Sequence, residues 1–259
     1  MAFKSPLRYP GGKTRAIRIL ETYIPADKDV IVSPFLGGGS FELHCSSKGM
    51  TVLANDLFRP LYIFWKVLKE NPEELQKMVQ EEIPVTKEKF SKYRREIMNM
   101  TNDLEIATAY YIVNRCSFSG STFCGGFSQQ ASSGRLNQAA IDRLTNVSMD
   151  KFTLSNVDCN EFLDGIPETD SMVIYADPPY YIETYVYGKD GDMHEGFDHI
   201  LFATQIKKRK SWVLSYNDCR FIRDLYSDCK IDSVRWSYGM SIKPSSEIVI
   251  TPRIPGGDA

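Results

Sequence analysis

The 259-residue chain lacks several features that mark special classes of protein. No apolar run approaches the ~20 residues that a membrane-spanning helix needs. The six cysteines include no C-x-x-C pair, and their spacings match neither a zinc site nor a disulfide framework. Residues 1–15 hold no apolar stretch between a basic start and a cleavage site, so nothing in them indicates secretion. We therefore expect a soluble cytoplasmic protein with reduced thiols, or a nuclear or viral-factory protein if the host is eukaryotic.

An excess of positive charge is also missing. Lys and Arg number 31 against 33 Asp and Glu, which gives a formal net charge of −2. This balance argues against a generally basic nucleic-acid binder, but it allows a local basic face. Any contact with DNA must therefore be concentrated in one part of the chain.

Short apolar segments that alternate with helical periods predict an α/β fold. Strands are expected at residues 29–32, 50–54, 151–155, 171–176, 211–216, 229–236 and 247–251. Between the second and third of these segments the strand signals stop. There, Asn71 precedes a proline at a first helical position, and Thr86 begins another helix. The strands are thus expected to form one sheet that a helical segment interrupts.

We therefore predict a core made of residues 1–66 and 146–259, and an insert made of residues 67–145. Within the insert, residues 117–134 are rich in Ser, Gly and aromatic side chains. That composition is too polar for a core segment and predicts a hairpin or a mobile loop.

The strongest chemical signal is Asp177-Pro178-Pro179-Tyr180, which directly follows an apolar strand. Ligands of open α/β sheets bind beyond the carboxyl ends of the strands, so this motif should project into an active cleft. An aromatic amine is a poor nucleophile because its lone pair is delocalised into the ring. Asp177 and the carbonyl of Pro178 can accept its two hydrogens, while the prolines fix the backbone and Tyr180 offers a stacking face. The alternative is a rigid turn after a strand.

A glycine-rich segment, Pro34-Phe35-Leu36-Gly37-Gly38-Gly39, follows the first strand, and Asn55-Asp56 closes the second. Glycines let a backbone approach a ligand closely, and a strand-end carboxylate such as Asp56 can hold ribose hydroxyls. The last glycine of G-x-G-x-x-G is absent, which favours a nucleoside cofactor without phosphates over a dinucleotide. A tight turn between strand and helix is the simpler alternative.

Two further segments could contribute to the same site. In Tyr9-Pro10-Gly11-Gly12-Lys13, the lysine could meet a carboxylate such as that of methionine. Phosphate is a rival ligand, although the Walker spacing is not met, and a plain turn is a third alternative. Asp158-Cys159 follows another strand, where Asp158 could accept from the adenine amine of a cofactor or cap the next helix.

With these motifs in this order, the sequence resembles the Dam-like class of AdoMet-dependent adenine-N6 DNA methyltransferases. Residues 114–120, 214–217 and 247–251 match as well, so the resemblance covers most of the chain. It implies a Rossmann-like methyltransferase core with a mixed, mostly parallel seven-stranded sheet and a mainly helical target-recognition insert. It also implies catalysis by Asp177 to Tyr180, with S-adenosyl-L-methionine (AdoMet) as the cofactor. The residues assigned to the cofactor are Tyr9, Gly12, Lys13, Pro34, Phe35, Gly37, Gly38, Gly39, Asn55, Asp56, Asp158, Cys159 and Asp177.

One position departs from the family pattern. Members of the class usually carry Asp or Glu where Ser33 stands, two residues before Phe35, and this acid would bind the ammonium group of the cofactor. A hydroxyl or a carbonyl nearby could replace the acid, with weaker cofactor affinity as one result.

The insert carries the predicted contacts with double-stranded DNA. Arg115 and Arg135 bracket the Ser/Gly/aromatic loop, and a basic, flexible element can pair an arginine with guanine in a groove. Solvated surface arginines are the alternative. Ser117 and Ser119 of the same loop are also assigned to DNA. The resemblance suggests a short palindromic site such as GATC or CATG, in a solitary methylase or one with a cognate restriction endonuclease, and leaves the oligomeric state open.

No metal site is expected, because His194 and His199 lack a matching cysteine or carboxylate spacing. No membrane contact is expected either, because the chain has no long apolar run. Three other functions are possible alternatives: methyl transfer to a different substrate, DNA binding without catalysis, and nicotinamide-dependent oxidoreduction. The same chemistry could act on RNA adenine, the cytosine amine or a protein glutamine. The intact Asp177 motif argues against an inactive DNA-binding subunit. The broken glycine fingerprint argues against a nicotinamide oxidoreductase.

Overall fold

In the computed structural model, residues 4–181, 196–236 and 246–253 are described, which leaves His194 outside them. Seven strands form one sheet in the order β3-β2-β1-β4-β5-β7-β6. Strands β1 to β5 pair in parallel, whereas β7 is antiparallel to both of its neighbours. The strands are β1 (Val30–Ser33), β2 (Thr51–Asn55), β3 (Phe152–Ser155), β4 (Met172–Ala176), β5 (Trp212–Asn217), β6 (Lys230–Val234) and β7 (Glu247–Thr251). The predicted mixed, mostly parallel seven-stranded sheet is confirmed.

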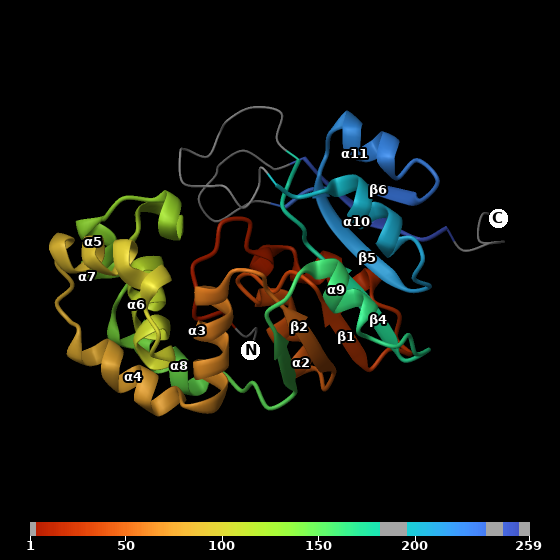
Figure 1. The fold of residues 1–259 in the computed structure, drawn as a ribbon. Coiled ribbons are helices and arrows are strands. Elements are labelled where there is room, and N and C mark those ends of the chain that lie inside the picture. The colour runs from red at the N-terminus through yellow and green to blue at the C-terminus, as the bar shows by residue number, and fades with distance from the viewer. Residues whose placement is uncertain (1–3, 182–195, 237–245, 254–259) are drawn as a thin grey trace.

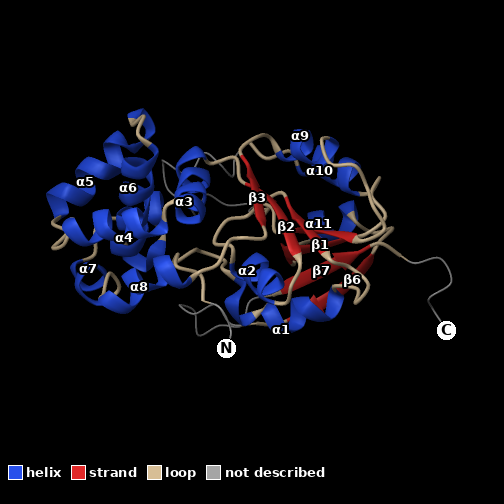
Figure 2. Cartoon of the chain, turned by 90° about the horizontal axis from the view of Figure 1, so that it is seen from below, coloured by secondary structure: helices blue, strands red, loops and turns tan. Residues whose placement is uncertain are grey.

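Helices cover both faces of this sheet, which explains why its central strands are mostly apolar. Along β4, Val173 and Tyr175 pack into one hydrophobic cluster, while Ile174 and Ala176 pack into the other. Figure 2 shows helices on opposite sides of the strands. On one side lie α1 (Ile17–Leu20) and α2 (Ser40–Ser47), and on the other lie α9 (Cys159–Asp164), α10 (His199–Ile206) and α11 (Arg220–Leu225).

Between β2 and β3 the chain forms a group of helices beside the sheet (Figure 1). These are α3 (Arg59–Glu70), α4 (Pro72–Glu81), α5 (Lys87–Glu96), α6 (Asp103–Cys116), α7 (Gln129–Gly134) and α8 (Gln138–Asn146). Helix α4 begins at the predicted proline, and Thr86 caps α5 by accepting a hydrogen bond from Lys89 N (3.2 Å). Helix α6 is central to the group, with the rings of Tyr111 and Phe64 of α3 stacked 5.8 Å apart. The predicted boundary between residues 66 and 67 falls inside α3.

The segment 117–134, expected to be a hairpin or a loop, contains one antiparallel bridge between Ser117 and Phe127. Two single 3-10 turns follow Ser117, and α7 occupies the end of the segment. Ser128 begins α7 because its hydroxyl accepts a hydrogen bond from Ala131 N (3.1 Å). The serine-rich segment 117–134 therefore contains a helix cap as well as turns.

No described helix is long and apolar enough to cross a membrane. All six cysteines are free thiols in this structure.

Candidate active site

The ends of three parallel strands are joined by one buried side chain. Asn55, the last residue of β2, donates from Nδ2 to the carbonyl oxygens of Pro34 (3.2 Å) and Val157 (3.0 Å). Its Oδ1 accepts from the amide of Val157 (3.0 Å). The segments that follow β1, β2 and β3 are therefore held at one edge of the sheet, which is the edge where open α/β sheets bind ligands.

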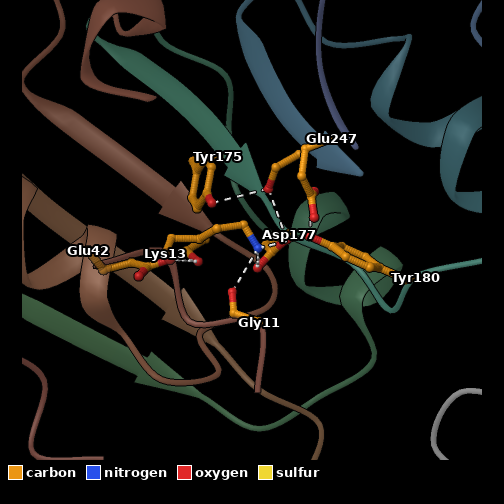
Figure 3. A network of polar contacts seen from close by, with 9 residues as sticks. Gly11, Lys13, Glu42, Tyr175, Asp177, Tyr180 and Glu247 are labelled. Carbon is orange, nitrogen blue, oxygen red and sulfur yellow. Dashed lines mark hydrogen bonds and ion pairs between the residues drawn. The ribbon is translucent and has the colours of Figure 1, made fainter. Parts of the chain in front are cut away.

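Asp177 lies directly after β4, at the next strand end along this edge. Its Oδ2 is 2.5 Å from the ammonium nitrogen of Lys13, and its Oδ1 accepts a hydrogen bond from Ser215 Oγ of β5 (2.9 Å; Figure 3). The hydroxyl of Tyr175 lies 3.2 Å from Ser215 Oγ. Asp177 is 24% exposed and Lys13 only 4%. The carboxylate is thus fixed in direction while it stays open on one side.

Lys13 lies beside Asp177 and Tyr180 in this structure. Besides Asp177, its ammonium donates to the carbonyl oxygen of Gly11 (3.0 Å) and to the hydroxyl of Tyr180 (3.1 Å). The Tyr180 hydroxyl in turn donates to Oε2 of Glu247 (2.8 Å), a buried residue of β7. These contacts hold the Tyr180 ring in one orientation beside Asp177 (Figure 3).

The glycine-rich segment is held by Asp56. The amide of Gly37 donates to Oδ2 of Asp56 and the amide of Phe58 donates to Oδ1, both at 2.9 Å. Burial raises the pKa of Asp56 to about 6, although the two backbone hydrogen bonds by themselves lower it. Each oxygen keeps one further lone pair for a ligand.

The side chain of Tyr9 packs directly on the glycines. A Cβ atom at Gly38 would lie 2.6 Å from the Tyr9 Cβ, and one at Gly37 would lie 3.0 Å from its ring. Gly37 also has a φ of +49°, in the left-handed region that side chains avoid. Tyr9 itself is 40% exposed, so its ring forms part of the open surface at this edge.

Phe35 and Asp158 complete the set predicted for a cofactor. The ring of Phe35 contacts Phe197 and Phe202 edge to face, at centroid distances of 5.5 and 5.2 Å. Asp158 caps α9, because its Oδ1 accepts from the amide of Asn160 (2.8 Å). The neighbouring Cys159 is buried, which raises the pKa of its thiol to about 12 and leaves it protonated near neutral pH.

Residues 9–240 match the model of a protein family described as the D12 class of N6 adenine-specific DNA methyltransferases. The chain belongs to this family. It is therefore an adenine-specific DNA methyltransferase, and DNA is its substrate. The suspected resemblance to Dam-like adenine methyltransferases is confirmed.

Two solved structures resemble this methyltransferase at a low level of similarity. Precorrin 8w decarboxylase from Methanobacterium thermoautotrophicum is 12% identical over 94% of this chain and 91% of that one, with a TM-score of 0.41. Precorrin-6y C5,15-methyltransferase from Geobacter metallireducens GS-15 is 12% identical over 92% and 86%, with a TM-score of 0.38. These values are too low to support an inference about function.

The structure adds to the site of the methyltransferase a residue that the sequence motifs did not reveal, Glu42. It is the third residue of α2 and only 3% exposed, and its Oε1 accepts a hydrogen bond from Ser33 Oγ (2.7 Å). The pKa of Glu42 is raised to about 7, mainly by burial. The charge of Asp177 also raises this pKa, whereas the charge of Lys13 lowers it. A buried carboxylate therefore lies at the position of Ser33, where the family pattern would place an acid. The one sequence signal was a charged residue between the apolar Phe41 and Leu43.

Ser215 and Glu247 were noted only as parts of matching segments. Both are buried, and both contact the predicted catalytic motif, Ser215 at Asp177 and Glu247 at Tyr180. Their roles depend on the neighbouring positions of β4, β5 and β7 in the sheet, which no local pattern encodes.

The four residues predicted to contact DNA do not form one exposed group. Arg115 is 6% exposed, and its guanidinium donates to the carbonyl oxygens of Arg135 and Pro6. Ser117 is fully buried, and its hydroxyl accepts from Thr122 N (3.0 Å). Ser119 is half-buried, whereas the Arg135 side chain is exposed.

Within the described ranges, no group of three His, Cys, Asp or Glu side chains could hold a metal ion. His199 is buried at the start of α10, where its Nδ1 lies 3.0 Å from the Tyr216 hydroxyl. Burial lowers the pKa of His199, so the ring is neutral at pH 7.

Proposed function

We propose that this enzyme transfers a methyl group from AdoMet to the N6 amine of an adenine flipped out of a short palindromic duplex site. The observation that carries the proposal is the Asp177 carboxylate, oriented by Lys13 and Ser215 beside a tethered Tyr180 ring. When bound, AdoMet supplies a methyl group on a positively charged sulfur, which makes the methyl carbon electrophilic. A base inside the duplex cannot reach such a site, so the target adenine must leave the stack.

Asp177 is suited to hold the target amine. Each carboxylate oxygen has two lone pairs, and one on each is used by Lys13 or Ser215. The remaining acceptor positions can take an amine hydrogen, and the carbonyl of Pro178 can take the other. The negative charge of Asp177 then stabilises the positive charge that the nitrogen gains during transfer. Tyr180 supplies the stacking face for the flipped base.

The residues at the β1 and β2 ends fit a nucleoside cofactor with a charged tail. Asp56 has free acceptor positions for ribose hydroxyls, and the glycines at 37 and 38 leave the backbone accessible wherever Tyr9 does not cover it. The three donors of Lys13 are all used, by Gly11, Asp177 and Tyr180. A contact from Lys13 to a cofactor carboxylate therefore requires that one of these bonds opens. We assign Lys13 first to positioning Asp177, and Glu42 to the ammonium of the cofactor.

Replacement of Asp56 by Asn tests the ribose contact. Asn keeps an acceptor for one backbone amide but loses the charge, so AdoMet should bind roughly 10-fold more weakly. Calorimetric titration measures the affinity, and Asp27→Asn, at a carboxylate 71% exposed, is the control. Unchanged AdoMet affinity in a folded Asp56→Asn protein would remove Asp56 from the site. Asp56→Ala is less suited, because it also leaves the amides of Gly37 and Phe58 without acceptors.

We also propose that residues 67–145 are the target-recognition insert and that residues 1–66 and 146–259 are the catalytic core. The arrangement of α4 to α8 beside the sheet supports this division (Figure 1). A role either as a solitary methylase or beside a cognate restriction endonuclease belongs to the same proposal, as does an intracellular location.

Expression in a host that lacks DNA methylation tests the function directly. Sequencing of the genomic DNA should find 6-methyladenine at nearly all copies of one short palindrome, and at far fewer copies with the Asp177→Asn variant. Methyl groups on cytosine, on RNA or on protein in place of DNA adenine would contradict the proposal.

A further inference from the structure

A second polar site lies between the N-terminal segment and the helices α6 to α8. A hollow of about 280 Å³, here called the arginine pocket, is lined by five basic side chains together with Ser5, Leu7 and Thr14. The basic residues are Lys4, Arg8, Arg115, Arg135 and Arg143. They come from the N-terminal segment, the end of α6, the turn after α7, and α8. No carboxylate is among the residues that line the pocket.

Three arginines of the arginine pocket lack a counter-charge among the described residues, since no carboxylate there lies within ion-pair distance of Arg115, Arg135 or Arg143. Arg115 donates only to carbonyl oxygens, and the buried Nε of Arg143 has no hydrogen-bond partner among the described residues. Burial lowers the pKa of Arg115, and the charges of Arg143 and Arg8 lower it further.

Like charges repel, and a buried donor without an acceptor costs free energy. Elsewhere on this molecule Lys13, which is as buried as Arg115, is paired with Asp177. An anion in the arginine pocket would remove the repulsion and supply the missing acceptor. The hollow has room for a phosphate group with several waters, since one water takes about 30 Å³.

We propose that the arginine pocket binds a phosphate group, and that this group belongs to the backbone of the substrate DNA. The pocket adjoins the catalytic site, because Arg8 and Thr14 are chain neighbours of Tyr9 and Lys13. A protein with a net charge of −2 needs such a local concentration of positive charge to hold a duplex. The proposal rests on DNA being the substrate, and it gives Arg135 a phosphate contact in place of a base contact.

The double variant Arg135→Gln/Arg143→Gln tests the pocket and leaves Arg115 as it is. The carbonyl of Arg135, which holds Arg115, is unchanged by this variant. Duplex affinity should fall roughly 10-fold at low salt, equally for cognate and unrelated sequences. The slope of log affinity against log salt should fall by ~1, as expected for one lost phosphate contact. AdoMet affinity, measured by calorimetry, should stay within twofold of the unchanged protein.

The matched control is Lys48→Gln/Lys230→Gln, which removes two charges that are 61% and 62% exposed. An equal loss of salt dependence in the control would overturn the proposal, because general charge would then explain it. Weakening at one base pair alone would overturn it in favour of base reading by Arg135. Protection of the unchanged protein from heat by inorganic phosphate, with normal DNA binding by the pocket variant, would assign the pocket to free phosphate instead. Failure of the unchanged protein to methylate DNA would count against the proposed function and not against the pocket.

Discussion

The variant Asp177→Asn is expected to transfer methyl groups ~100-fold more slowly than the unchanged enzyme, or more slowly still. Asn preserves the shape of the side chain but removes the negative charge, and it can present an N–H donor to the amine. Because the attacking nitrogen gains positive charge, the loss falls on the transition state more than on binding. AdoMet affinity should therefore change little. Single-turnover transfer of labelled methyl to a cognate duplex, beside calorimetry on the same sample, measures both quantities.

The ion pair between Asp177 and Lys13 changes what this variant does to stability. The sequence motif alone predicts an unchanged melting temperature. In the structure, Asp177→Asn leaves the ammonium of Lys13 buried without its counter-charge, and removal of one partner of a buried pair destabilises by about 3–5 kcal/mol. We therefore expect a lower melting temperature in Asp177→Asn.

The double variant Lys13→Gln/Asp177→Asn separates the two effects. It removes both charges, so it should recover much of the lost stability while turnover stays low. If turnover recovers along with stability, the slow transfer of the single variant reflects damage to the fold. Near-normal turnover in the single variant Asp177→Asn would show that Asp177 is not catalytic and that the motif is a rigid turn.

The variant Glu42→Gln is expected to bind AdoMet roughly 10- to 100-fold more weakly, because a buried carboxylate is the strongest partner for the cofactor ammonium at this position. Gln retains the hydrogen bond from Ser33 and nearly the same volume, so the fold should survive. The combined variant Ser33→Asp/Glu42→Gln moves the acid to the position that family members usually use. Partial recovery of affinity in that combination would distinguish a charge contact from a packing role. Equal AdoMet affinity in Glu42→Gln and the unchanged enzyme would exclude Glu42 from the cofactor site.

The pH dependence of Glu42 gives a readout that does not need activity. Its pKa in the cofactor-free fold is about 7, above the usual 4.5, so the fold favours the protonated form. The contribution of Glu42 to stability is therefore full below about pH 4.5 and is lost as the pH rises through 7. The melting temperature of the unchanged protein should fall over this range relative to that of Glu42→Gln. An ammonium bound beside Glu42 favours its ionised form, so AdoMet binding near pH 6.5 should release more protons from the unchanged protein than from Glu42→Gln. Calorimetry in buffers of different ionisation enthalpy measures that release.

Local patterns were sufficient for the strands and for the order of the motifs. The apolar run 172–176 predicted β4, and the polar tetrapeptide after it predicted a functional strand end, because strand ends in parallel sheets meet at one edge. The change from strand to helical periods after β2 predicted helices between β2 and β3, where the structure has α3 to α8. It missed α7, because a Ser-rich segment forms turns and helix caps equally well.

The sequence by itself therefore determined the sheet, the helices that interrupt it and the position of the Asp177-Pro178-Pro179-Tyr180 motif at a strand end, since these depend on periodicity and on residues next to each other in the chain. Only the tertiary structure decided which charges meet. Lys13 pairs with Asp177 across 164 residues, Glu42 occupies the place of the missing acid at Ser33, and Arg115 is buried against the carbonyls of Arg135 and Pro6. Such contacts depend on how strands and loops are placed in space, and the free energy of a charged group depends on its burial and partners, neither of which a local pattern records.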